Sequence, residues 1–111
     1  MRAATLRKMT ATEVIIRQGD QADNFYVISE GRVEVTQTAE DGQSRLLRQM
    51  APGEFFGEIG LLSRVPRTAT VTALTNGTLI SLPGDAFLEL VSEGPGLTYR
   101  LLDLHRGATA D

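Results

Sequence analysis

Short apolar runs separated by glycine-containing turns fill residues 13–82. In EGRVEVTQT (30–38), Val33 and Val35 face one way and the intervening polar residues the other, which is typical of a strand with one buried face. Other runs are rich in β-branched, aromatic or leucine residues: EVII (13–16), NFYVIS (24–29), SRLLRQM (44–50), TATVTAL (68–74) and TLISL (78–82). These runs predict a chain built mainly from short strands.

Two turns indicate how the strands connect. The Asp41-Gly42 pair favours a hairpin between 30–38 and 44–50, and TNG (75–77) predicts a second hairpin between 68–74 and 78–82. Short strands joined in this way favour a mainly β fold, an antiparallel β-roll or jelly roll.

The pattern changes to helical spacing after the last strand. GDAFLELVSEG (84–94) places Phe87, Leu88 and Val91 on one face, and LTYRLLDLHR (97–106) repeats that spacing with leucines. We therefore expect two C-terminal helices within residues 84–106, behind a β-roll at 13–82.

One stretch of the middle, FFGEIGLLSRVPRTATV (55–71), is neither strand nor simple turn. GEIGLL (57–62) suits a single helical turn, whose unpaired amide groups favour negative charge. Glu58 can only accept hydrogen bonds, which suits a ligand hydroxyl, and Arg67 carries a planar fork of donors that matches phosphate. The pair is therefore either a site for a sugar phosphate or an exposed ion pair worth about 0–1 kcal/mol.

Composition narrows the possible classes of function. The chain has 111 residues, the size of one domain, and its net charge of −3 argues against direct contact with nucleic acid or an anionic membrane. It has no cysteine and one histidine, which removes thiolate catalysis and leaves too few ligands for a cupin-type metal centre. We expect no enzyme, no metal site and a cytoplasmic setting, which includes the cytosolic part of a membrane protein.

Two separated motifs resemble one known family. GEFFGEIGLLSRVPRTATV (53–71) resembles the phosphate-binding cassette of cyclic nucleotide-binding domains, as in the effector domain of catabolite activator proteins. RQGDQADNFYVISEGRVEV (17–35) resembles the first hairpin of these domains, and SLPGDAFLELV (81–91) the helix after the roll. The resemblance covers about residues 13–104.

The resemblance implies a ligand and its contacts. Glu58 would bind the ribose 2′-hydroxyl and Arg67 the cyclic phosphate, with Thr68 beside the phosphate or the base. The backbone of Gly57, Ile59 and Gly60 would lie near the ligand. Further residues implied at the pocket or over the purine are Phe56 and, with weaker support, Val35, Leu46, Phe55, Ala69 and Leu101.

The chain also departs from the family. Gly60 stands where the family usually has Ala, which costs the short helix about 1 kcal/mol. Residues 1–12 would form only part of the family's N-terminal helical segment, and no helix-turn-helix follows the roll. We therefore expect a cassette at 54–71 within an isolated sensor module.

These observations favour a regulatory module that binds a cyclic nucleotide and controls an output domain of the same parent chain or a partner, such as a transporter, channel or kinase. No polar residue of the helix expected at 97–106 is placed to read guanine, so cyclic AMP is favoured and cyclic GMP remains possible. Two alternatives stay open: the effector domain of a transcription regulator without its DNA-binding part, and a domain of this fold that no longer binds nucleotide.

Overall fold

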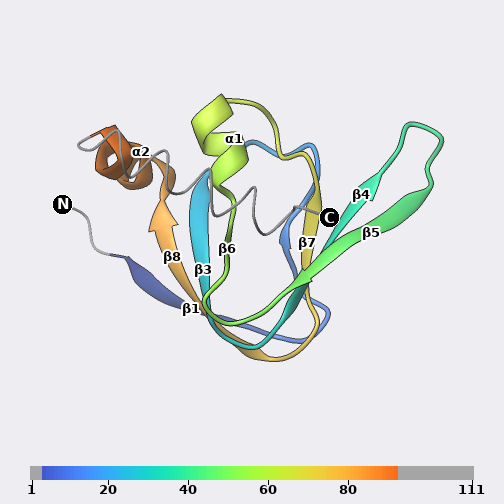
Figure 1. Ribbon diagram of the computed structural model, residues 1–111, viewed down its shortest axis with the longest axis horizontal. Helices are drawn as coiled ribbons and strands as arrows, with labels where there is room; N and C mark the ends of the chain where they lie inside the picture. The colour runs from blue at the N-terminus through green and yellow to red at the C-terminus, as the bar shows by residue number, and fades with distance from the viewer. Residues whose placement is uncertain (1–3, 93–111) are drawn as a thin grey trace.

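The structure, a computed structural model, describes residues 4–92, which form two four-stranded antiparallel sheets and two helices (Figure 1). One sheet has the order β1-β8-β3-β6 and the other the order β2-β7-β4-β5. The strands are β1 (Thr5–Met9), β2 (Val14–Ile16), β3 (Asn24–Glu30), β4 (Val33–Thr38), β5 (Ser44–Met50), β6 (Phe55–Phe56), β7 (Thr70–Ala73) and β8 (Gly77–Pro83). The prediction of a mainly β, antiparallel fold is confirmed.

Two helices complete the described part of the chain. The cassette helix α1 spans Glu58–Ser63, and α2 spans Gly84–Ser92 directly after β8. Both lie at the same end of the sheets in Figure 1, and they contact each other. The short cassette helix and the first C-terminal helix are thus confirmed, whereas the helix expected at 97–106 lies outside the described residues. Neither α1 nor α2 is long and apolar enough to cross a membrane.

The main core lies between the two sheets. Ile28 and Leu79 from one sheet meet Val33 and Met50 from the other, and each is at most 1% exposed. The alternation at Val33 and Val35 correctly predicted which face of β4 is buried. Burial of these apolar side chains, worth about 1.5–3 kcal/mol each, is what holds the sheets together.

A second, smaller core lies on the outer face of the β1-β8-β3-β6 sheet. Phe25 of β3 stacks on Phe87 of α2, with ring centroids 4.5 Å apart, and Leu61 of α1 joins the same cluster. Successive side chains of a strand point to opposite faces. Phe55 therefore packs in this helix-covered core, whereas Phe56 stacks on Tyr26 in the main core.

The N-terminal segment differs from the sequence-based expectation. Residues 1–12 are expected to form part of a helical segment, but Thr5–Met9 form the strand β1, which pairs with β8 along its whole length. Met9, 3% exposed, is buried in the main core. Pairing with β8 satisfies the backbone groups on one side of this segment, so tertiary context overrides the helical preference expected from the family.

The second predicted hairpin is also wrong. β7 pairs with β2 and β4, whereas β8 pairs with β1 and β3 in the other sheet. The connecting residues follow the neighbouring corner between β3 and β4 instead of closing a tight turn. The Leu74 amide donates to the Arg32 carbonyl oxygen, and the Thr75 hydroxyl oxygen accepts from the Arg32 amide. The β4–β5 hairpin, by contrast, is confirmed.

Tyr26 makes the stability of the main core depend on pH. Its burial, and next the nearby Asp23 carboxylate, raise the pKa of Tyr26 above its ordinary value near 10. Above about pH 10 the unfolded chain therefore releases the phenol proton more readily than the folded chain, and stability falls as the pH rises. Urea unfolding at about pH 8 and pH 10.5 should show a smaller alkaline loss in Tyr26→Phe than in the wild type. Equal losses would contradict the role assigned to Tyr26.

Candidate functional site

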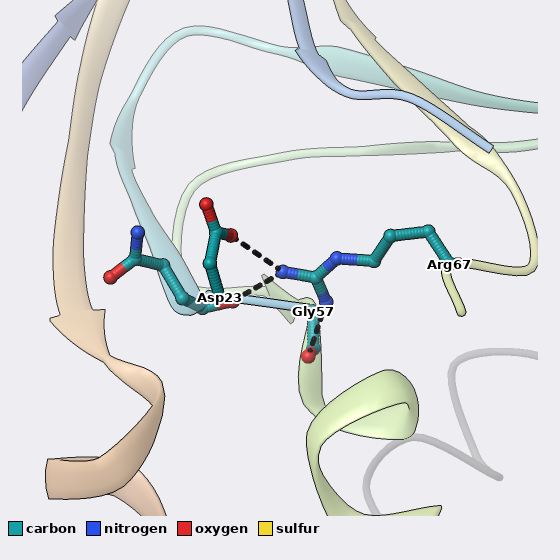
Figure 2. Close-up of polar contacts among 4 residues, drawn as sticks. Asp23, Gly57 and Arg67 are labelled. Atoms are coloured by element: carbon teal, nitrogen blue, oxygen red, sulfur yellow. Dashed lines mark hydrogen bonds and ion pairs between the residues drawn. The ribbon is translucent and has the colours of Figure 1, made fainter. Parts of the chain in front are cut away.

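The guanidinium of Arg67 is buried, although the residue itself lies at the end of a surface loop. Its side chain is 5% exposed, and it reaches across to the start of β3 and to the residue before α1 (Figure 2). Nη1 donates to the Gly57 carbonyl oxygen at 2.7 Å, and Nη2 donates to the Asn24 carbonyl oxygen at 2.7 Å. Nη2 also lies 3.3 Å from a carboxylate oxygen of Asp23, whose side chain is 72% exposed. Arg67 therefore fastens three chain segments together.

Three of the five N–H groups of the guanidinium are used in these contacts with described residues. Two donors are thus left for a ligand without breaking the contacts to the protein. The backbone of Arg67 is fixed as well, because its amide donates to the Asp20 carbonyl oxygen and its carbonyl oxygen accepts from the Gly19 amide. The charged group is therefore held in position before any ligand arrives.

The start of α1 places Glu58 beside this arginine. Gly57, the residue before the helix, has φ 98°, a left-handed conformation that glycine adopts at little cost. A Cβ atom at this position would lie 2.9 Å from the Asn24 carbonyl oxygen. This turn directs Glu58 inward, where it is only 1% exposed. The sequence left open that Glu58 and Arg67 form an exposed ion pair. The burial of the Glu58 carboxylate does not agree with that alternative.

A pocket of about 70 Å³ opens between α1, the following loop and the β2-β7-β4-β5 sheet. It is lined by most of the predicted site residues, namely Val35, Phe56, Gly57, Glu58, Ile59, Gly60, Arg67, Thr68 and Ala69. Its walls therefore combine apolar side chains, one buried carboxylate and one buried guanidinium. Within residues 4–92 no group of three or more histidine, aspartate or glutamate side chains is placed to hold a metal ion.

The structure does not bring every predicted residue to this pocket. Leu46 of β5 is 55% exposed and Phe55 packs in the second core, so neither lines the pocket. Leu101 lies outside the described residues. Arg48 of β5 does line the pocket, and the sequence analysis did not identify it. The only signal was its position two residues before the buried Met50, on the same face of a regular strand.

Two glutamine side chains, Gln37 on β4 and Gln18 in the loop before β3, form hydrogen bonds with backbone atoms near the end of the cassette. The Gln37 side chain donates to the Thr68 carbonyl oxygen at 3.1 Å. The amide group of Gln18 makes two bonds with the backbone of Thr38, one to the carbonyl oxygen and one from the amide. The β4–β7 pairing ends at Thr36 and Thr70, so these glutamines continue the connection where the backbone ladder stops.

Gly60 lies in a close contact that explains why this position lacks a side chain. A Cβ atom at Gly60 would come within 2.8 Å of the Ala22 Cβ atom and 3.2 Å of the Val65 carbonyl oxygen. Distances under 3.0 Å require a neighbour to move. The helix-propensity cost of this glycine is therefore offset by close packing of α1 against the loop before β3.

This chain is similar to a known family of domains and to several known proteins. The family model described as the cyclic nucleotide-binding domain matches residues 6–93. An uncharacterized ABC transporter ATP-binding protein of Mycobacterium tuberculosis is 42% identical over 79 residues, which cover 71% of this chain and 24% of the relative. The cAMP-dependent protein kinase regulatory subunit of Dictyostelium discoideum is 43% identical over 81 residues, which cover 70% of this chain and 25% of that protein.

A solved structure is similar over almost the whole chain. The crystal structure of the Thermus thermophilus catabolite activator protein has a TM-score of 0.84 and 30% sequence identity, and the match covers 95% of this chain and 49% of that chain. The chain therefore spans about a quarter of the two curated relatives and about half of this structure.

The contacts of Arg67 predict a structural role that can be separated from ligand binding. Arg67→Ala would leave the Gly57 and Asn24 carbonyl oxygens without their donors, at about 1–3 kcal/mol each, so we expect a loss of about 2–6 kcal/mol in unfolding free energy. Asp23→Asn is the matched control, because it removes only the exposed ion pair and should cost less than about 1 kcal/mol. Chemical denaturation measures both, and equal effects would show that the ion pair, not the carbonyl contacts, holds Arg67.

The packing at Gly60 predicts that a helix-favouring substitution destabilises the domain. Gly60→Ala should gain about 1 kcal/mol of helix propensity but lose more through the clash with Ala22, and so lower the melting temperature. In an Ala22→Gly background the same substitution should be tolerated better, since the nearest atom is gone. Thermal melts of the two single variants and the double variant test this coupling. Purely additive effects would contradict it.

Proposed function

The chain belongs to the cyclic nucleotide-binding domain family, and we propose from this premise that its pocket binds cyclic AMP or cyclic GMP and that binding regulates an output domain. The output domain would be part of the same parent chain or a partner. The module itself would not be catalytic. It would act by changing conformation when the nucleotide binds.

The observation that carries this proposal is the presence of two buried groups of opposite charge in one pocket, Glu58 and Arg67. A cyclic nucleotide offers a hydroxyl donor and an anion close together on one sugar. Glu58 would accept a hydrogen bond from the ribose 2′-hydroxyl, and the two remaining donors of Arg67 would bind the cyclic phosphate. As an argument for a ligand site, the burial of Glu58 counts for more than that of Arg67, because the burial of Arg67 is also explained by its contacts within the fold.

The size of the pocket supports coupling between binding and movement. Its volume of about 70 Å³ is well below the roughly 300–1,000 Å³ of typical ligand sites. A nucleotide would therefore widen the pocket or shift the cassette around it. Because α1 packs on α2 through Leu61 and Phe87 in the second core, movement of α1 would be transmitted to α2.

The relatives support different outputs for the same kind of module. They are an ABC transporter ATP-binding protein, a kinase regulatory subunit and a catabolite activator protein. A transporter, channel or kinase therefore remains our proposal for the output. The likeness to the activator protein favours, as the second candidate, the effector domain of a transcription regulator whose DNA-binding part lies elsewhere. A domain that has lost nucleotide binding is the third, and the burial of Glu58 in the pocket weighs against it.

Thermal scans test nucleotide binding directly. At a ligand concentration 100-fold above its dissociation constant, the folded state gains about 2.7 kcal/mol, which for a domain this small raises the melting temperature by on the order of 10 °C. Cyclic AMP and cyclic GMP should produce such a shift, and 5′-AMP, which lacks the cyclic phosphate, serves as the control ligand. No shift with either cyclic nucleotide at millimolar concentration would favour the domain that no longer binds.

Substitutions at the two charged residues assign that shift to the pocket. Arg67→Ala should weaken binding by about 30- to 1,000-fold, and Glu58→Ala by less, because Arg67 meets a full charge and Glu58 a neutral hydroxyl. Calorimetry is done at a temperature where the destabilised Arg67 variant is still folded. Wild-type affinity in both variants would place the ligand elsewhere.

A further inference from the structure

The β2-β7-β4-β5 sheet carries most of the exposed apolar side chains of residues 4–92. Four of the six large hydrophobic side chains that are exposed in this part of the chain belong to this sheet or directly follow one of its strands. They are Val14 of β2, Leu46 and Leu47 of β5, and Leu74 after β7. Helix α2 contacts β3 and β8 of the other sheet, and α1 contacts β3 (Figure 1). Neither described helix therefore accounts for this apolar surface.

The strand registers place two of these side chains in rows across the outer face of the sheet. One row contains Val14, Thr72 and Glu34, and the next contains Leu46, Thr36 and Thr70. Their chain neighbours Val35 and Val71 are buried and line the pocket on the inner face, so the residues of both rows point to the opposite side. The outer face thus combines aliphatic and threonine side chains with a carboxylate.

The charges on β4 at this face are of opposite sign. Arg32 and Glu34 flank the buried Val33, so both point away from the main core. Neither forms an ion pair with another residue that the structure describes. In an interface with twofold symmetry, each contact between residues i and j occurs twice, once in each direction. Arg32 of one copy can therefore pair with Glu34 of a second copy, and the reverse pair forms at the same time.

The free edge of β5 is less suited to association than this face. β5 is the last strand of its sheet, and it carries Arg45, Arg48 and the bulge at Leu47. Charged side chains and bulges on an edge strand discourage the addition of another strand. Two copies paired edge to edge would also bring two basic strands together, whereas packing between the outer faces avoids this repulsion.

We propose that the outer face of the β2-β7-β4-β5 sheet is a self-association surface, on which a second copy of this chain packs around a twofold axis. The surface lies on the opposite side of the sheet from the pocket, and association does not depend on the proposed nucleotide binding. Strands about 4.8 Å apart, with about 3.3 Å per residue, give this face roughly 300–400 Å². Two copies would bury about 600–800 Å², below the roughly 1,200 Å² of stable complexes, so the dimer should be weak.

Sedimentation equilibrium without nucleotide measures this association. The chain has a mass of 12.0 kDa, and its average mass should rise towards twice this value between about 10 µM and 1 mM. Leu46→Asp places two carboxylates in the interface and should raise the dissociation constant of the dimer at least about tenfold. Leu6→Asp is the matched control, because Leu6 is more exposed than Leu46 but lies on β1 of the other sheet. It should leave the dissociation constant unchanged.

Reversal of the two charges tests the twofold arrangement. Arg32→Glu and Glu34→Arg each leave the face with charges of one sign, so each should weaken its own dimer at least about tenfold. An equal mixture of the two variants should associate again, because each supplies the charges that the other lacks. The variant with both substitutions should dimerise as the wild type does. A contact through another face of the molecule would not recover in the mixture.

Thermal melts of each variant at about 5 µM, where the chain is monomeric, show whether a substitution also changes the fold. These positions lie on the surface, so the melting temperatures should stay within about 4 °C of the wild type. A chain that remains monomeric at about 1 mM would refute the proposal, and a lower melting temperature in Leu46→Asp would then show that residues of the same molecule cover the face. A dimer that is insensitive to Leu46→Asp, or that does not recover in the mixture, would place the contact elsewhere and also refute it.

Discussion

A guanidinium group loses most of its hydration when it is buried, so Arg67 is stable in its place only because protein oxygens replace the lost water. Two of these oxygens belong to the backbone of Asn24 and Gly57, at the start of β3 and just before α1. The start of α1 is thus tied to one buried side chain, in addition to the packing of Leu61 and Gly60. That position in turn directs Glu58 inward and forms one wall of the pocket. Retention of Arg67 would be expected even in a domain without a ligand, so its presence alone is weak support for binding.

The two cores connect the pocket to both sheets and to α2. The main core joins the sheets and holds the pocket wall that carries Phe56, whereas the second core joins Phe25 of β3 to α1 and α2. Phe55 and Phe56 are adjacent in sequence and belong to different cores, so β6 lies between the main core and the second core. A displacement of the cassette therefore changes packing on both faces of one sheet. Close-packed interiors have few voids to absorb such a change locally.

Local sequence patterns predicted much of the fold correctly, and the predictions that were wrong have a common cause. The Asp41-Gly42 turn and the alternation in β4 are local signals, and both the β4–β5 hairpin and the buried face were predicted correctly. The N-terminal strand and the crossing between β7 and β8 depend on which distant segment pairs with which, and a local pattern carries no such information. TNG can close a hairpin or turn a corner equally well. The contacts at the β3–β4 corner decide which of the two forms.

The site shows the same limit on a smaller scale. The register of β4 and β5 shifts between Val35 and Thr36, so that Arg48 faces Val35 and Leu46 faces Thr36, with Leu47 as the extra residue. A bulge of this kind reverses the alternation of side chains along the rest of the strand. Leu46, expected at the purine pocket, is exposed as a result, and Arg48 remains on the inner face with Met50. In a strand with regular alternation, Leu46 and Arg48 lie on the same face, so the sequence SRLLRQM alone does not predict that only Arg48 lines the pocket.

The two arginines of the pocket differ in how firmly they are held. Arg67 is bound by backbone carbonyl oxygens, which do not change with the side chains around them, so its position is set by the fold. Arg48 extends from an edge strand beside a bulge, and its buried Nη1 has no hydrogen-bond acceptor among the residues that the structure describes. In a chain of net charge −3, anion binding must come from local groups such as these. The pocket thus contains one cation that backbone contacts hold in place and one that is less completely paired within the described part of the chain.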